Sequence, residues 1–121
     1  MKIQESAENY LETILMLQER KAHVRSIDIV NELDFSKPSV SIAMKNLREN
    51  GYILMDKDGY ITLTKAGQKI AETMYERHLF LSQWLVRLGV EQQTAVHDAC
   101  RIEHVISAES FEAIKRHVES S

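Results

Sequence analysis

The sequence of 121 residues has little of several residue types, and each shortage excludes a class of protein. One cysteine cannot form an internal disulfide, so a disulfide-stabilised secreted fold is excluded and a cytoplasmic location is expected. One proline and four glycines argue against a loop-rich fold or a flexible linker. No apolar run approaches the roughly 20 residues that a membrane span needs, and the polar residues 1–6 do not resemble a signal peptide.

Positive charge is also in short supply, because 15 Lys and Arg residues face 18 Asp and Glu residues. The chain as a whole therefore lacks the basic excess that indicates nucleic-acid binding, and any DNA contact must use a local cluster. Hydrophobic residues at 44% and charged residues at 27% are typical of a folded globular chain. The length suits one domain or two small ones that share a core.

Hydrophobic spacing predicts a mainly α-helical chain that contains one small β-hairpin. The predicted helices cover about residues 6–20, 26–33, 37–50, 65–88, 93–106 and 108–118. The predicted helix N-caps are Ser6, Ser26, Ser36, Thr64 and Ser107. Two β-prone runs, 52–55 and 60–63, flank an Asp-Gly turn and predict the hairpin.

Helix, short helix, turn, helix and hairpin is the order of a winged helix-turn-helix, whose second paired helix enters the major groove of DNA. The helix over 37–50 takes that place, with Val40, Met44 and Leu47 facing inward. Its outer face and the hairpin tip supply groups that can contact phosphates or base edges. These candidate DNA-binding residues are Lys37, Ser39, Ser41, Ile42, Lys45, Asn46, Arg48 and Lys57. Acidic residues nearby reduce the net positive charge of this cluster, so a single copy is expected to bind DNA weakly. A dimer that reads two half-sites is therefore expected.

A second cluster of candidate ligands lies in the segment 97–104. On a helix, Cys100, Glu103 and His104 point to one side, with His97 one turn earlier, and their thiolate, carboxylate and imidazole groups form a transition-metal ligand set. His78, on the preceding long helix, can supply a further nitrogen. The alternative interpretation is that the cysteine is a buried hydrophobe and the Glu-His pair a solvated face. Catalysis has little support, because no zincin, zinc-finger or phosphate-loop motif is present.

Both clusters together resemble the DtxR/MntR family of metal-dependent transcriptional repressors, over nearly the whole chain. The segments that carry the resemblance are 7–14, 36–41, 63–67, 77–78 and 97–107. The resemblance implies an N-terminal winged helix over residues 1–64 and a helical metal-binding and dimerisation domain over 65–121. It also implies a homodimer that binds double-stranded operator DNA and controls iron or manganese uptake genes. From the resemblance we expect the short form of the family, which lacks the C-terminal SH3-like domain of longer members.

Carried over position by position, the family's metal ligands fall on Asn9, Glu12, His78, His97, Cys100, Glu103 and His104. Asn9 stands where iron-type members have Met and manganese-type members have Asp, so its neutral carbonyl is a weaker or altered ligand. Cys100 resembles the iron type and Glu12 the manganese type, while Ser82 replaces a carboxylate of an ancillary site. The expected metal is therefore Fe²⁺ or Mn²⁺, with Zn²⁺, Co²⁺ or Ni²⁺ able to bind in vitro.

The sequence thus predicts a metal-dependent repressor that is not an enzyme and that binds neither a membrane nor a small organic substrate. A metal-independent winged-helix regulator with a structural or vestigial metal site is the main alternative. A small metalloenzyme and a protein-interaction module also remain open. Apolar residues on the long helix exceed what one small domain needs, and we interpret them as dimer interface: Leu79, Phe80, Trp84, Leu85 and Leu88.

Overall fold

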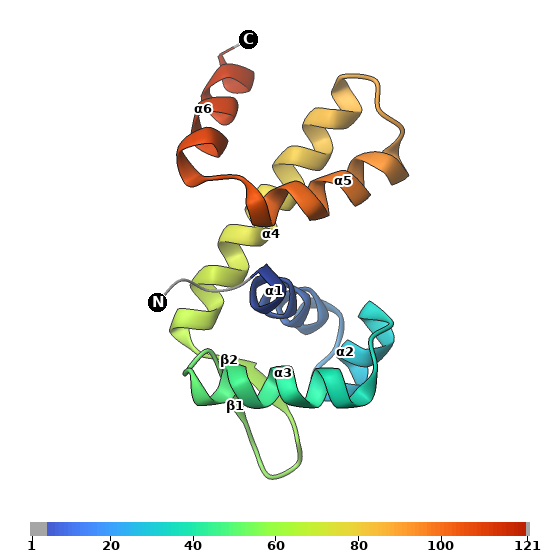
Figure 1. Ribbon diagram of the computed structural model, residues 1–121, viewed down its shortest axis with the longest axis vertical. Coiled ribbons are helices and arrows are strands. Elements are labelled where there is room, and N and C mark those ends of the chain that lie inside the picture. Colours follow the sequence, from blue (N-terminus) through green and yellow to red (C-terminus); the bar gives the residue numbers. More distant parts are fainter. Residues whose placement is uncertain (1–4, 121) are drawn as a thin grey trace. The chain divides into compact units, whose positions relative to one another are not determined.

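The computed structural model describes residues 5–120 of the chain (Figure 1). Residues 1–4 and Ser121 lie outside the described residues. The first of these segments belongs to the polar start of the chain that argues against a signal peptide. The chain divides into two compact units, Met1–Glu72 and Thr73–Ser121. Each unit is described by itself below.

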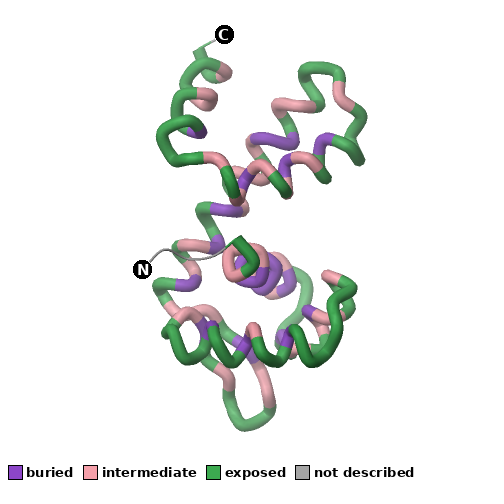
Figure 2. Tube along the Cα trace, viewed as in Figure 1, coloured by how far each residue is buried: buried purple, intermediate pink, exposed green. Residues whose placement is uncertain are grey.

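The first unit consists of helices followed by a hairpin. Its elements are α1 (Glu5–Arg20), α2 (Ser26–Leu33), α3 (Lys37–Glu49), β1 (Ile53–Met55), β2 (Ile61–Leu63) and the start of α4 (Lys65–Arg87). They share one hydrophobic core, to which α1 contributes a run of buried residues (Figure 2). The buried core residues are Tyr10, Leu11, Ile14, Leu17, Val24, Ile29, Val40, Met44, Leu47, Ile53, Ile61 and Ala71. The predicted mainly α fold with a small hairpin is confirmed.

The limits of α3 follow from its capping residues, and its N-cap is the predicted Ser36. The Ser36 hydroxyl accepts a hydrogen bond from the Ser39 N–H at 3.2 Å, and Pro38 lies in the first turn, where a missing N–H costs little. Gly51 follows the helix with a φ of +79°, a conformation that only glycine adopts without strain. The helix that carries the candidate DNA-binding residues therefore has locally determined ends.

The start of α2 differs from the prediction. Ser26 is the first helical residue, and Arg25 occupies the N-cap position. The Arg25 N–H donates to the Asp28 carboxylate at 2.8 Å, so the acid three residues ahead performs the capping. Of the two isoleucines in the first turns of α2, Ile27 is 42% exposed while Ile29 is fully buried. Two residues apart on a helix point in nearly opposite directions, so only one of this pair can face the core.

The hairpin pairs β1 with β2 in antiparallel register. The Asp56 carboxylate closes its turn by accepting hydrogen bonds from the N–H groups of Asp58 and Tyr60, each at 2.9 Å. The sequence did not predict a further pairing, in which the Ile61 N–H donates to the Val24 carbonyl at 2.7 Å. This bridge joins the link between α1 and α2 to the first residue of β2, next to the hairpin turn.

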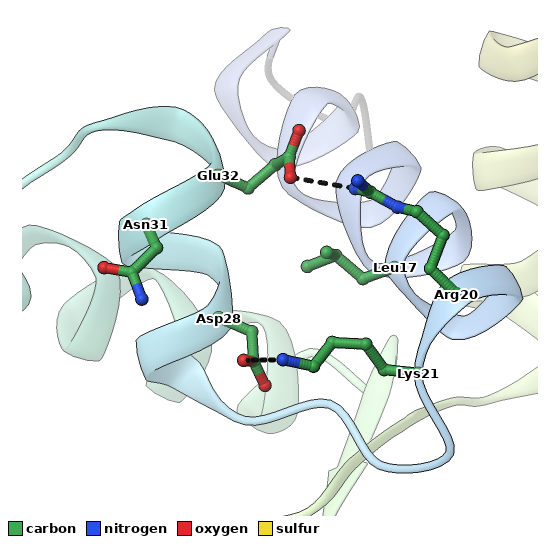
Figure 3. Close-up of a pocket in the computed structure, with 6 residues that line it drawn as sticks. All are labelled: Leu17, Arg20, Lys21, Asp28, Asn31 and Glu32. Atoms are coloured by element: carbon green, nitrogen blue, oxygen red, sulfur yellow. Dashed lines mark hydrogen bonds and ion pairs between the residues drawn. The ribbon is translucent and has the colours of Figure 1, made fainter.

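Two ion pairs, from the last residue of α1 and from the residue after it, join this helix end to α2 at the surface (Figure 3). Arg20 contacts Glu32 at 2.8 Å, and the Lys21 ammonium contacts the Asp28 carboxylate at 2.7 Å. The two pairs, with Leu17 and Asn31, line a cavity of about 240 Å³. Because these charges already neutralise one another in pairs, we interpret the residues that line this cavity as holding the two helices together rather than as binding a ligand.

The pH dependence of stability tests the ion pair between Lys21 and Asp28. The hydrogen bond that Asp28 accepts from Lys21 is the main reason why the pKa of its carboxyl is lowered from 3.8. A lowered pKa stabilises the fold above the pKa of the unfolded chain, and that contribution disappears as the pH falls through the folded-state pKa. We expect Asp28→Asn to lose about 0.5–1 kcal/mol of unfolding free energy at neutral pH, because a partly exposed pair contributes little. The difference from the parent should shrink below about pH 3.8 in urea unfolding.

The control for this experiment is Asp58→Asn, which removes one carboxylate from the exposed hairpin turn. A difference between parent and Asp28→Asn that stays constant down to acid pH would contradict the role assigned to the ionised carboxylate.

The second unit contains the rest of α4, then α5 (Gln92–Val105) and α6 (Ala108–Glu119). Its core forms around Leu81, Ala99 and Phe111, against which half-buried apolar side chains pack. The Phe80 and Phe111 rings meet edge to face with centroids 5.5 Å apart. The predicted cap of α6 is confirmed, since the Ser107 hydroxyl accepts from the Ser110 N–H at 3.0 Å.

The apolar excess predicted on α4 is only partly exposed. Leu79 and Leu88 are 42% and 64% exposed, whereas Phe80 and Trp84 pack against the core of their own unit. The surface left for a partner is therefore smaller than the sequence suggested. Within residues 5–120, every helix is too short or too polar to cross a bilayer.

Candidate metal centre and nucleic-acid interface

The candidate metal centre begins with one face of α5. Cys100, Glu103 and His104 offer a thiol, a carboxylate oxygen and an imidazole nitrogen that all lie within 4.8 Å of one another. Their spacing of three and four residues places them on one side of a helix, as the sequence predicted. Glu103 is completely buried and Cys100 is half-buried.

Two histidines face the Glu103 carboxylate. The His78 Nδ1 atom, from α4, is 3.4 Å from one carboxylate oxygen, and the His104 Nε2 atom is 3.4 Å from the other. Both distances exceed those of ordinary N–H···O hydrogen bonds. Burying a carboxylate is costly unless opposite charge compensates it, and a bound cation supplies that charge. This donor set therefore fits a divalent transition metal.

Arg77 supports this centre from α4, a role that sequence reasoning missed. Its Nη1 atom donates to the carbonyl oxygens of Glu103, at 3.1 Å, and Ile106, at 3.0 Å. The guanidinium also lies over the Phe111 ring at 5.5 Å. It thus satisfies carbonyls at the end of α5, where a positive charge is favourable. The sequence marks Arg77 only within the segment 77–78 that carries the family resemblance, because the spacing of residues does not reveal a contact with backbone carbonyls.

The remaining predicted ligands are distributed differently. His97 is exposed on α5 and is not among the donors gathered at Glu103. Glu12 is buried and Asn9 half-buried on α1, in the first unit. Ser82, which stands where the family's ancillary carboxylate would be, donates its hydroxyl to the His78 carbonyl at 2.8 Å. The three predicted ligands named here stay predictions.

The candidate DNA-binding face is the outer side of α3 (Figure 2). Val40, Met44 and Leu47 are buried, and the opposite side is open to solvent. Lys45 lies 4.0 Å from Glu49, an exposed and therefore weak pair that leaves the ammonium available. All of the candidate DNA-binding residues that the sequence predicted are exposed: Lys37, Ser39, Ser41, Ile42, Lys45, Asn46 and Arg48 on α3, and Lys57 on the hairpin.

An exposed recognition-type helix in one unit and a buried metal-ligand cluster in the other define a metal-responsive DNA-binding protein. Two family models match the chain: the DNA-binding domain of iron-dependent repressors over residues 2–61, and their metal-binding and dimerisation domain over 64–120. The chain belongs to the iron-dependent repressor family, which is the DtxR/MntR family predicted from the sequence. It is thus a member of the metal-dependent transcriptional repressors.

Individual relatives agree with this assignment. The transcriptional regulator MntR of Bacillus subtilis is 34% identical over 90% of this chain and 77% of its own length. MntR of Lysinibacillus sphaericus is 32% identical over 90% of this chain and 78% of its own. Among solved structures, the manganese regulator SloR superposes with a TM-score of 0.83 at 27% identity, over all of this chain and 56% of its own. A manganese-dependent transcriptional repressor in complex with manganese has a TM-score of 0.84 at 28% identity, over 93% of this chain and 52% of its own.

Proposed function

We propose that the chain is a repressor of iron or manganese homeostasis genes whose homodimer binds operator DNA when a divalent metal is bound. The buried Glu103, with Cys100, His104 and His78 around it, is the observation that carries this proposal. From the family resemblance we add Glu12, His97 and Asn9 as further ligands. We also propose a boundary near Thr64 between the DNA-binding domain, 1–64, and the metal-binding and dimerisation domain, 65–121.

The donor set bears on the choice of metal. The Cys100 thiolate favours Fe²⁺ over Mn²⁺, whereas carboxylate and imidazole suit either ion. The two solved structures named above are a manganese regulator and a manganese-dependent repressor, so both ions belong in any test, with Zn²⁺, Co²⁺ and Ni²⁺ as probes in vitro. A bound metal would supply positive charge at the buried carboxylate. We propose a cytoplasmic regulator rather than an enzyme, because the family's two domains bind DNA and metal.

The proposal is tested by metal-dependent DNA binding. The purified chain would select from a randomised duplex library under anaerobic conditions with Fe²⁺, Mn²⁺, Zn²⁺ or a chelator, and enriched duplexes would then be titrated. We expect metal to raise DNA affinity by about 5- to 150-fold, and DNA to raise metal affinity equally, because the coupling is reciprocal. Equal affinity in chelator would support the metal-independent regulator. A library with no enrichment under any metal would exclude DNA recognition.

The same titrations identify the residues of α3 that bind phosphates. Replacing Lys45 or Arg48 with Ala should reduce the slope of log affinity against log salt by about 0.9 for each phosphate that the variant no longer neutralises. Arg116→Ala, which removes an exposed charge from α6, is the matched control. An unchanged slope in both α3 variants would remove these residues from the DNA interface.

A further inference from the structure

We propose that Ile42 reads thymine in the major groove through contact with its C5-methyl group. This inference deepens the proposed function and rests on it, since it concerns what α3 recognises in operator DNA. The observation behind it is that Ile42, a large aliphatic residue, is 62% exposed in the middle of a polar helix face.

Helix geometry places Ile42 opposite the core. Val40 and Met44 are each two residues away and almost fully buried, and two residues span about 200° around a helix. Its side chain therefore points directly away from the first unit. Its neighbours three and four positions along the helix are all exposed, and three of them are polar: Pro38, Ser39, Lys45 and Asn46.

The chemistry of these neighbours indicates the occupant of this face. Lys45 can neutralise a phosphate, and Asn46 can pair with an adenine edge, so an apolar side chain one turn before them on the same face is placed to meet an apolar feature of DNA. The thymine methyl is that feature of base edges in the major groove, and the minor groove does not display it. Contact would remove both the methyl and the exposed Ile42 surface from water, which is favourable.

The experiment uses the duplexes selected by the metal-loaded chain from a randomised library. Each thymine of the enriched sequence is replaced in turn by deoxyuridine, which removes only the methyl group. At one or two positions in each half-site we expect the loss of the methyl to weaken binding about fourfold, corresponding to about 0.8 kcal/mol. Ile42→Ala should bind the thymine and uridine duplexes equally well at those positions.

Leu54→Ala is the matched control, because Leu54 is 61% exposed in the same unit but lies on β1. It should keep the preference for thymine over uridine. The inference is overturned if no uridine substitution weakens binding, or if the preference survives in Ile42→Ala. Those outcomes are distinct from failure of the proposed function, in which no duplex would be enriched.

Discussion

Glu103→Gln should abolish the metal-induced gain in DNA affinity, which we expect to be about 5- to 150-fold in the parent chain. The carboxylate is completely buried, with the His78 and His104 nitrogens each 3.4 Å from one of its oxygens. Glutamine keeps the size of the side chain but removes the negative charge that a divalent cation requires. Removing a residue that only supports a metal ligand weakens metal binding by about 10- to 100-fold. Because Glu103 is itself a proposed ligand, we expect its replacement to weaken metal binding at least as much. Calorimetric metal titration and DNA titration measure the two effects.

Two controls separate metal binding from folding. Glu112→Gln removes an exposed carboxylate from α6 and should leave metal binding unchanged. Cys100→Ser alters the same cluster at a half-buried position, so it tests the site even if Glu103→Gln unfolds. Thermal unfolding without metal reports the fold of each variant. A folded Glu103→Gln chain that still binds DNA more tightly with metal would contradict the assignment of the centre.

Gly67→Ala should destabilise the first unit by about 3 kcal/mol, at the upper end of the cost of overpacking. Alanine normally stabilises a helix interior by about 1 kcal/mol relative to glycine, so the expected sign is reversed. The reason is that a Cβ atom here would overlap the carbonyl oxygen of Tyr52 and lie 3.0 Å from its carbonyl carbon. That carbonyl is held in place by the Thr64 N–H, which donates to it at 3.1 Å. Urea unfolding of the metal-free chain measures the effect.

Gly59→Ala is the matched control in the hairpin turn. An added Cβ there meets nothing within 4 Å, although the φ of +79° carries a strain of about 1 kcal/mol. We therefore expect it to lose clearly less stability than Gly67→Ala. If Gly67→Ala were as stable as the parent, the close approach of α4 to the start of β1 would be wrong.

Local features of the fold could be predicted well, because the interactions that produce them join residues close together in the chain. Ser36 and Ser107 cap their helices as predicted, and Gly51 ends α3. Two predicted caps are wrong, because Ser6 lies inside α1 and Ser26 is the first residue of α2. There Asp28 takes over by accepting from the Arg25 N–H, and the link before it pairs with the hairpin through Val24. The N-cap of α2 thus lies one residue earlier than the sequence indicated.

The candidate site divides in the same way. Cys100, Glu103 and His104 could be grouped from the sequence, because a helix brings positions three and four apart onto one face. The approach of His78 to Glu103 could only be suggested, since it depends on how α4 packs against α5. The sequence also placed His97 with this group, but the structure leaves it exposed on the helix and outside the donors at Glu103.

The sequence by itself determined the order of the helices, the hairpin, the polar outer face of α3 and the ligand-bearing face of α5. The tertiary structure decided that Arg77 holds the carbonyl of Glu103, 26 residues away, and that Gly67 admits the backbone of Tyr52. The physical reason is the distance along the chain over which each kind of interaction acts. Capping, turn formation and helical periodicity act within about four residues of the chain, whereas these contacts exist only after the helices have packed.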